Sequence, residues 1–151
     1  MFRGVSPINV DAKGRMAMPA KYRERLNELC EGRLVLTVDF DKCLMLFPEG
    51  EWDQLERKLV RLPSLNPRAR RLQRLLLGYA TECELDGNGR ILLPAVLREY
   101  AGLDKRIVLV GQGNKFEIWN EEVWNGNRDE WLAAEAAGED ALPEELESLS
   151  F

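Results

Sequence analysis

The chain has 151 residues, 45% hydrophobic and 31% charged, which is enough for one folded domain or for two small interlocked halves. It contains no histidine and no Cys-x-x-Cys pair, which excludes serine–histidine and cysteine–histidine catalytic pairs and nearly excludes a zinc site. We therefore expect no enzyme, no cofactor and no metal.

The chain has no apolar run near the roughly 20 residues of a membrane span, and its first residues lack the apolar core of a signal peptide. We expect a cytoplasmic protein in which Cys30, Cys43 and Cys83 are buried free thiols. The net charge is −5, but it is unevenly distributed: residues 1–100 carry 17 basic and 14 acidic residues, whereas residues 101–151 carry 4 and 12. A local basic patch can therefore exist despite the acidic total.

The first part of the chain predicts a hairpin, a short helix and two further strands. Runs 7–10 and 15–18 are strand-like, and between them Asp11 and Gly14 favour a tight turn. Pro19 suits the start of a helix whose apolar face would be Tyr22, Leu26, Leu29 and Cys30, with Gly32 at its end. Runs 34–38 and 44–47 predict strands.

The middle of the chain predicts two helices packed as a hairpin. Residues 51–62 place Trp52, Leu55, Leu59 and Leu62 on one face. Asn66-Pro67 is typical of a helix start, and Gly78 follows its end. Along this second helix, the side opposite the apolar one carries Arg70, Arg71 and Arg74.

Residues 85–99 repeat residues 10–24. Asp, Gly, Arg, Pro and Ala recur 75 residues apart, so that Asp11, Gly14 and Arg15 correspond to Asp86, Gly89 and Arg90. Strand-like runs at 107–110 and 116–119 follow, as in the first copy, and Trp124 corresponds to Trp52 at the start of a further helix. The chain therefore contains a tandem duplication.

One such unit has too few strands to be stable alone, whereas two units could pair their strands into a closed barrel. We predict an α+β fold with a first unit (1–52), a connecting helical hairpin (53–79), a second unit (80–124) and an acidic helical tail (125–151). Trp124 and Trp131, seven residues apart, are expected to lie on one amphipathic helix. A break of that helix is expected at 138–140, followed by a last short helix from 142–144.

Several of these segments together resemble the MraZ family over nearly the whole chain. The resemblance rests on Met1–Gly4, the turns Asp11–Arg15 and Asp86–Arg90, the segment Asn66–Gly78, and Val110–Trp119. It implies a bacterial transcriptional regulator with two AbrB-like swapped-hairpin units that form a double swapped-hairpin β-barrel. It also implies a ring-shaped homo-oligomer that binds short repeated sites on double-stranded DNA upstream of the division and cell-wall gene cluster, usually as a repressor, and hence a nucleoid-associated protein.

The two copies differ in charge, and the difference suggests where DNA would bind. Residues 1–23 carry five basic residues against Asp11 alone, whereas residues 84–98 have no net charge. We therefore expect the first copy to supply most of the DNA contact. Arg15 is the best candidate for reading guanine, because its planar fork matches O6 and N7. The candidate DNA-binding residues are Arg3, Lys13, Arg15, Lys21 and Arg90.

Simpler interpretations stay open. Asp11 and Asp86, with Gly14 and Gly89, can serve only to structure the turns, since a carboxylate repels phosphate. Arg15 and Arg90 can be partners of those carboxylates. Arg70, Arg71 and Arg74 can form salt bridges to Glu49, Asp53 or Glu56, within or between subunits. The alternative function is an oligomeric barrel scaffold that binds a protein partner or a small anion and not DNA.

Overall fold

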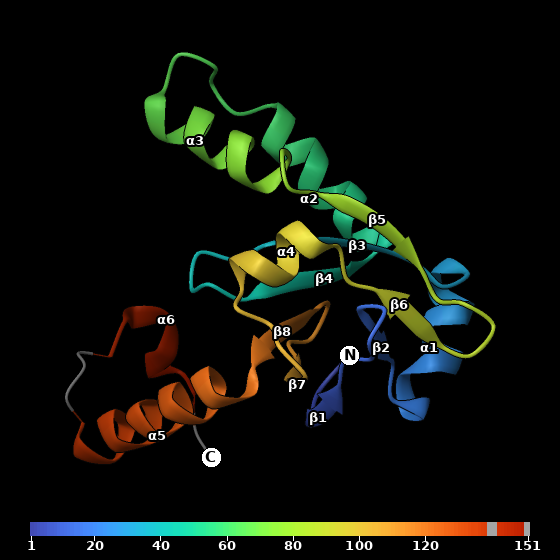
Figure 1. Ribbon diagram of the computed structural model, residues 1–151. Coiled ribbons are helices and arrows are strands. Elements are labelled where there is room, and N and C mark those ends of the chain that lie inside the picture. Colours follow the sequence, from blue (N-terminus) through green and yellow to red (C-terminus); the bar gives the residue numbers. More distant parts are fainter. Residues whose placement is uncertain (139–141, 150–151) are drawn as a thin grey trace. The chain divides into compact units, whose positions relative to one another are not determined.

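The computed structural model describes residues 1–138 and 142–149 (Figure 1). These form two compact units, Met1–Glu121 and Glu122–Phe151, which are treated separately below. The first half of the chain contains β1 (Val5–Asn9), β2 (Arg15–Ala17), α1 (Ala20–Cys30), β3 (Arg33–Val38), β4 (Leu44–Pro48) and α2 (Glu49–Val60), followed by α3 (Pro67–Leu76). The second half contains β5 (Thr81–Glu84), β6 (Arg90–Leu92), α4 (Ala95–Tyr100), β7 (Arg106–Gly111), β8 (Phe116–Asn120) and α5 (Glu121–Ala137), followed by α6 (Glu144–Glu147).

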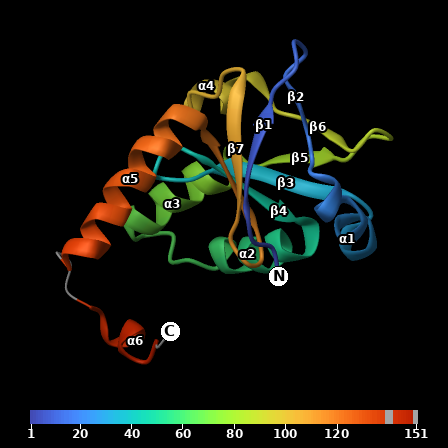
Figure 2. The ribbon, with the colours of Figure 1, turned by 90° about the horizontal axis from the view of Figure 1, so that it is seen from below.

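The same order of six elements therefore occurs twice, which confirms the duplication predicted from the sequence. Six strands form one antiparallel sheet in the order β1-β7-β8-β4-β3-β5, which reads the same from either end once the two halves are interchanged. β1 of the first half pairs with β7 of the second, and β5 of the second half pairs with β3 of the first. Each half thus gives its first strand to the other half, as Figure 2 shows for β1 and β7.

The fold is α+β as expected, but the expectation of a closed barrel is not met among the described strands. β1 and β5 end the six-stranded sheet, and the hairpin strands β2 and β6 form a separate two-stranded sheet. The reason is that β2 and β6 have three residues each, so they pair with one another and reach no further than a single bridge between Met16 and Val10.

The main core lies between the large sheet and the helices α1 and α4. Leu34, Leu36 and Val38 of β3 face this core, and Met16 and Ile91 enter it from the two-stranded sheet. Val35 alternates to the other face of β3, where it joins a second cluster with Phe47, Trp52, Leu59 and Leu76. Both faces of β3 are therefore buried from Leu34 to Val38, and the one polar side chain in this stretch, Thr37, donates a hydrogen bond to the Leu76 carbonyl at 2.7 Å.

The helices follow the predicted apolar faces with one exception. In α1, Tyr22, Leu26 and Cys30 are buried, but Leu29 is 63% exposed, so its assignment to the buried face was wrong. At about 100° per residue, Leu29 lies outside the arc that runs from Tyr22 through Leu26 to Cys30, at the edge of the buried stripe. The start of α3 is as predicted: the side-chain oxygen of Asn66 accepts hydrogen bonds from the amides of Arg68 and Ala69.

The second unit contains most of α5 and the short helix α6. Trp124 and Trp131 lie on one face of α5, with ring centroids 5.7 Å apart, as their spacing predicts. The predicted helix break at 138–140 falls mostly on residues 139–141, which are outside the described part of the chain. Across residues 1–138 and 142–149, none of the helices is both long and apolar enough to cross a membrane.

Candidate nucleic-acid interface

The two copies of the repeated turn lie side by side because β2 pairs with β6. The register aligns Arg15 with Leu92, Met16 with Ile91, and Ala17 with Arg90. Side chains alternate along a strand, so Met16 and Ile91 point into the core while the other four point outward. The outward face of this ribbon therefore carries one arginine from each copy in diagonal positions, with the exposed Ala17 and Leu92 between them.

The first turn is organised by Asp11. Its Oδ1 atom accepts hydrogen bonds from the backbone amides of Lys13 and Arg15, both at 2.9 Å, and its Oδ2 atom lies 3.0 Å from Nε of Arg15. One carboxylate thus closes the turn and orients the Arg15 side chain. That side chain stays 32% exposed, so its terminal nitrogens can still reach a ligand.

The second turn repeats the backbone bonds but not the ion pair. Oδ1 of Asp86 accepts from the amides of Asn88 and Arg90 at 2.8 and 3.0 Å. The Arg90 guanidinium instead approaches Asp11, with Nη1 3.9 Å from Oδ2. Arg15 and Arg90 therefore converge on one carboxylate, and Arg90 is held more loosely.

The backbone hydrogen bonds of these turns lower the pKa of both aspartates. The amide of Arg15 donates to Asp11 and is the main cause that holds the pKa of that carboxyl below its ordinary value. The amide of Arg90 does the same for the pKa of Asp86. Both side chains are therefore ionised at neutral pH and accept hydrogen bonds continuously.

Two arginines that were not among the predicted site residues, Arg23 and Arg98, each pack against the turn of the opposite copy. Arg23 of the first copy lies over Gly89 of the second, and Nε of Arg23 donates to the Met18 carbonyl at 2.6 Å. Arg98 lies over Gly14 in the same way and donates to the Leu93 carbonyl at 3.0 Å. A sequence signal for them exists, because each follows its own glycine by nine residues in both copies.

The other two candidate residues of the first copy, Arg3 and Lys21, lie away from the turns. Arg3 precedes β1, whereas Lys13 follows it, so five strand residues, roughly 17 Å, separate them. Lys21 is close to Arg3, since a Cβ on the intervening Gly4 would lie 3.0 Å from Nζ of Lys21. The backbone of Arg3 is held by the hydroxyl of Tyr22, which donates to its carbonyl. The structure therefore groups Lys13 with Arg15 and Arg90, and Arg3 with Lys21.

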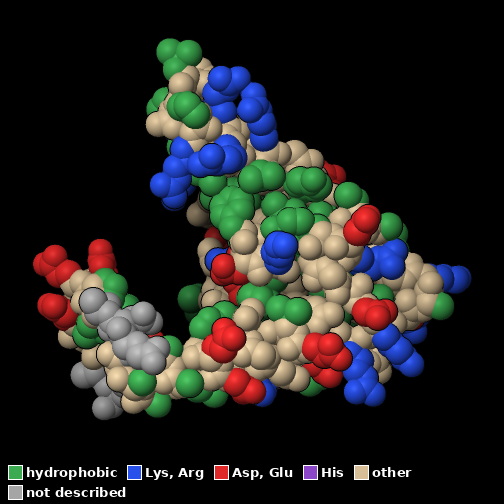
Figure 3. Space-filling view, turned by 60° about the vertical axis from the view of Figure 1, so that its left-hand side comes forward, with side chains coloured by type: hydrophobic (Ala, Val, Ile, Leu, Met, Phe, Trp, Pro, Cys, Tyr) green, Lys and Arg blue, Asp and Glu red, His purple; other side chains and the backbone are tan. Residues whose placement is uncertain are grey.

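The arginines of α3 belong to neither group. Arg70, Arg71 and Arg74 are exposed and form no ion pair within residues 1–138 and 142–149, so the predicted bridges to Glu49, Asp53 or Glu56 are absent within this part of the chain. Glu49 pairs with Arg33 instead, at 2.9 Å. Figure 3 shows basic side chains gathered on the projecting helical segment at its top.

A cluster that the sequence did not indicate joins Asp39, Cys43 and Glu117, whose side-chain ligand atoms lie within 4.8 Å of one another. Burial, reinforced by the neighbouring carboxylates, raises the pKa of the Cys43 thiol far above its ordinary value, and burial also raises the pKa of Glu117. Cys43 is a free thiol and is fully buried, as the sequence predicts.

Comparison with known proteins agrees with this architecture. The family model described as "MraZ protein, putative antitoxin-like" matches the chain twice, at residues 1–75 and 76–141. The chain belongs to the MraZ family. It is 62% identical to the protein named Transcriptional regulator MraZ of Thioalkalivibrio sulfidiphilus over the full length of both chains. Proteins of the same name from Halorhodospira halophila and Legionella pneumophila are 56% and 51% identical, again over their full lengths.

The two family matches divide the chain just before Leu76, the last residue of α3, and each contains one Asp-x-x-Gly-Arg turn. The pairing of β2 with β6 thus joins equivalent strands of two family repeats. The ribbon is the one place at which the described hairpin strands of both repeats meet, which makes it the candidate site.

Replacing Gly89 by alanine should destabilise the ribbon. Gly89 has a φ of 71°, and an added Cβ would lie 2.4 Å from Nε of Arg23. We expect a loss of about 1 to 3 kcal/mol in the free energy of unfolding, measured by urea denaturation. Gly87→Ala in the same turn is the matched control, because a Cβ there meets nothing within 4 Å. Equal losses for both variants would contradict the proposed contact.

The lowered pKa of Asp11 predicts a pH-dependent contribution to stability. Because its folded pKa lies below the ordinary value of 3.8, the carboxylate stabilises the fold above that pH, and the stabilisation is lost as the pH falls through the folded pKa. Asp11→Asn should be less stable than the original chain at pH 7, and the difference should shrink as the pH falls below 3.8. Urea unfolding across this range measures it, with Asp104→Asn as a control for removing one carboxylate. A difference that grows in acid would contradict the assignment.

Proposed function

We propose that the protein is a sequence-specific DNA-binding transcriptional regulator. The observation that carries this proposal is the outward face of the β2–β6 ribbon, which presents Arg15 and Arg90 together. A two-stranded ribbon fits the major groove, where an arginine fork can read guanine O6 and N7 and an apolar side chain can contact a thymine methyl group. Ala17 and Leu92, exposed between the arginines, suit the second contact. The name shared by the relatives supports regulation of transcription.

The first copy supplies the stronger half of this interface. Asp11 fixes Arg15 through a direct ion pair at 3.0 Å, so little side-chain freedom is lost when Arg15 binds a base. Lys13 at the tip of the first turn adds a charge where the second turn has Asn88. Arg90 is the second arginine on the outward face of the ribbon, and its Nη1 atom lies 3.9 Å from Oδ2 of Asp11.

Arg3 and Lys21 serve as phosphate contacts beside the ribbon. Arg3 lies at the end of β1 opposite to the turn, and Lys21 lies close to it, so these two side chains can meet the DNA backbone beside the bases that the ribbon reads. Contacts of this kind position the protein without reading sequence.

The finer features of the proposal concern assembly and targets. The exchanged strands and crossed arginines support an AbrB-like swapped-hairpin architecture for residues 1–52 and 80–124, joined by the helical hairpin 53–79 and followed by the tail 125–151. A ring of identical subunits would present the ribbon repeatedly, so weak single contacts would combine on repeated operator sites. We propose a cytoplasmic, nucleoid-associated repressor of the division and cell-wall gene cluster.

Arg15→Ala should weaken operator binding more than Arg90→Ala. We expect about a 10-fold or greater increase in Kd for Arg15→Ala, which corresponds to the roughly 1 to 3 kcal/mol of one bidentate base contact. Gel-shift titration at fixed salt measures both variants, and thermal unfolding checks that each is folded. Lys42→Ala, in a turn remote from the ribbon, should bind normally. Equal weakening by the two arginine variants would contradict the asymmetry between the copies.

Binding should depend strongly on both the number of operator repeats and the salt concentration. DNA with three or four repeats should bind more tightly than DNA with one, because linked contacts raise the effective concentration. Retention on heparin at low salt should disappear at moderate salt, since phosphate contacts release counterions. If one repeat binds as tightly as four, the array mechanism is wrong. An absence of binding to DNA and heparin would favour the scaffold that binds a protein or a small anion.

A further inference from the structure

The most basic segment of the chain lies outside the proposed DNA interface. Residues 57–76, here called the basic arm, contain seven arginine or lysine residues and no acidic residue. They form the last turn of α2, the loop after it and all of α3, which project from the sheet in Figure 1. On α3, Arg70 and Arg74 are one helical turn apart and Arg71 lies beside them.

The basic side chains of the arm form no ion pair within the described part of the chain, and some of the surface of the arm is apolar. Its four α3 arginines, Arg68, Arg70, Arg71 and Arg74, are exposed and form no ion pair with any described residue of the same chain. The loop at its tip exposes Leu65 to 92%, and Val60 nearby is 59% exposed. Like charges held this closely repel one another, so the arm favours an anionic partner that also covers apolar surface.

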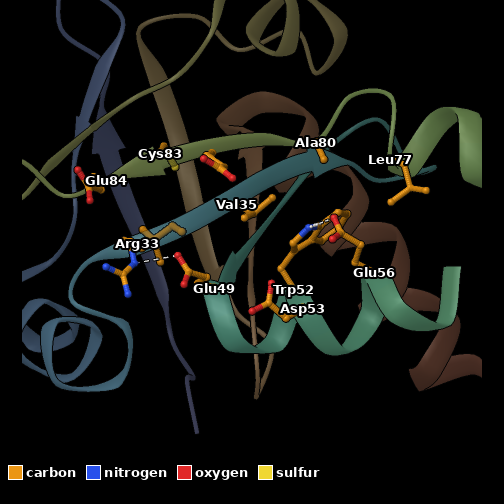
Figure 4. A pocket seen from close by; sticks show the side chains of 12 residues that line it. Arg33, Val35, Glu49, Trp52, Asp53, Glu56, Leu77, Ala80, Cys83 and Glu84 are labelled. Atoms are coloured by element: carbon orange, nitrogen blue, oxygen red, sulfur yellow. Dashed lines mark hydrogen bonds and ion pairs between the residues drawn. The ribbon is translucent and has the colours of Figure 1, made fainter. Parts of the chain in front are cut away.

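A surface with the opposite properties lies at the base of the same hairpin. Between α2 and the strands β3 and β5 is a groove of about 770 Å³, here called the acidic groove (Figure 4). Its floor is apolar and includes Val35, Trp52, Leu77 and Ala80. Its charged residues are Glu49, Asp53, Glu56, Glu82 and Glu84, with Arg33 as the one cation of the lining.

Only two carboxylates of the acidic groove, Glu49 and Glu56, have a hydrogen-bond or ion-pair partner within the described chain. Glu49 pairs with Arg33 at 2.9 Å, and Glu56 accepts a hydrogen bond from Nε1 of Trp52. Asp53, Glu82 and Glu84 accept no hydrogen bond and form no close ion pair with the rest of the described chain. The groove is thus an apolar trough with surplus negative charge, open to a basic and partly apolar occupant.

We propose that the basic arm of one copy of this chain binds in the acidic groove of the next copy. Arginine pairs with carboxylates in a fixed fork geometry, and the apolar tip of the arm matches the apolar floor of the groove. One chain carries both surfaces, so each copy can give its arm and receive another. This inference rests on the proposed oligomer and assigns its contact surfaces.

The two surfaces differ from one another, so the contact is head-to-tail. Such a contact does not end with two chains but continues until a rotation closes it into a ring. The β2–β6 ribbon belongs to neither surface, so every copy in the ring would keep its ribbon available. Assembly and DNA binding thereby become separable by mutation.

Charge reversal tests the contact. Arg70→Glu with Arg74→Glu reverses the arm, and Asp53→Lys with Glu82→Lys reverses the groove. Each double variant alone should fall, by light scattering without DNA, from the mass of the oligomer to that of the 17.3 kDa chain. Mixing the two variants should restore the oligomer with equal amounts of each, because every arm again meets a groove of opposite charge. Combining all four substitutions in one chain should restore it as well.

Two controls make the outcome specific. Glu24→Lys with Glu28→Lys reverses two exposed charges on α1, outside both surfaces, and should leave the mass unchanged. Arg15→Ala should weaken DNA binding at unchanged mass, so failure of the DNA proposal is distinguishable from failure of this one. Unchanged mass in the arm or groove variant would overturn the inference, as would monomers that fail to reassemble on mixing. Arm variants that lose DNA binding but stay oligomeric would show that the arm binds DNA.

Discussion

The crossing of the two repeats at β2 and β6 is the constraint on which the rest of the fold depends. The amide of Met18 donates to the Gly89 carbonyl at 2.8 Å, and the amide of Leu93 donates to the Gly14 carbonyl at 2.9 Å. Each bond joins a residue of one repeat to the turn of the other. Because the contact is reciprocal, neither hairpin reaches its native environment until the other half has folded, and both first strands are then placed beside the opposite half.

The same crossing explains why the turn sequence is repeated so closely. Arg23 and Arg98 pack on Gly89 and Gly14, where any Cβ would lie within 3.0 Å of a guanidinium atom. Asp11 and Asp86 stabilise the turns by accepting hydrogen bonds from backbone amides. These shared residues build the ribbon. The Lys13 side chain makes no hydrogen bond within the described chain, so it does not help to build the turn. The two copies differ at this position, since the second copy has Asn88 where the first has Lys13.

The sequence predicted the order of elements because periodicity, turn chemistry and the repeat act locally. Asn66 and Pro67 marked the start of α3, and the apolar run 34–38 marked β3. The closed barrel was not predictable, since closure depends on whether strands as short as Arg15–Ala17 can bridge to the larger sheet. The separation of Arg3 from Lys13 was also hidden, because a net charge summed over residues 1–23 takes no account of the strand that lies between them.

We assign different partners to the two arginine-bearing surfaces of this chain on the basis of their geometry and surroundings, and not of charge density alone. The segment with the most arginines, α3, lies on a projecting arm whose apolar residues and unpaired guanidinium groups match an acidic groove on the same molecule. The ribbon carries fewer charges, yet two of them are aimed outward from a rigid two-stranded sheet, and one is oriented by a carboxylate at 3.0 Å. Recognition of bases depends on such fixed geometry, whereas attraction between subunits tolerates longer and more flexible pairs. The two arginine-bearing surfaces are therefore suited to different partners.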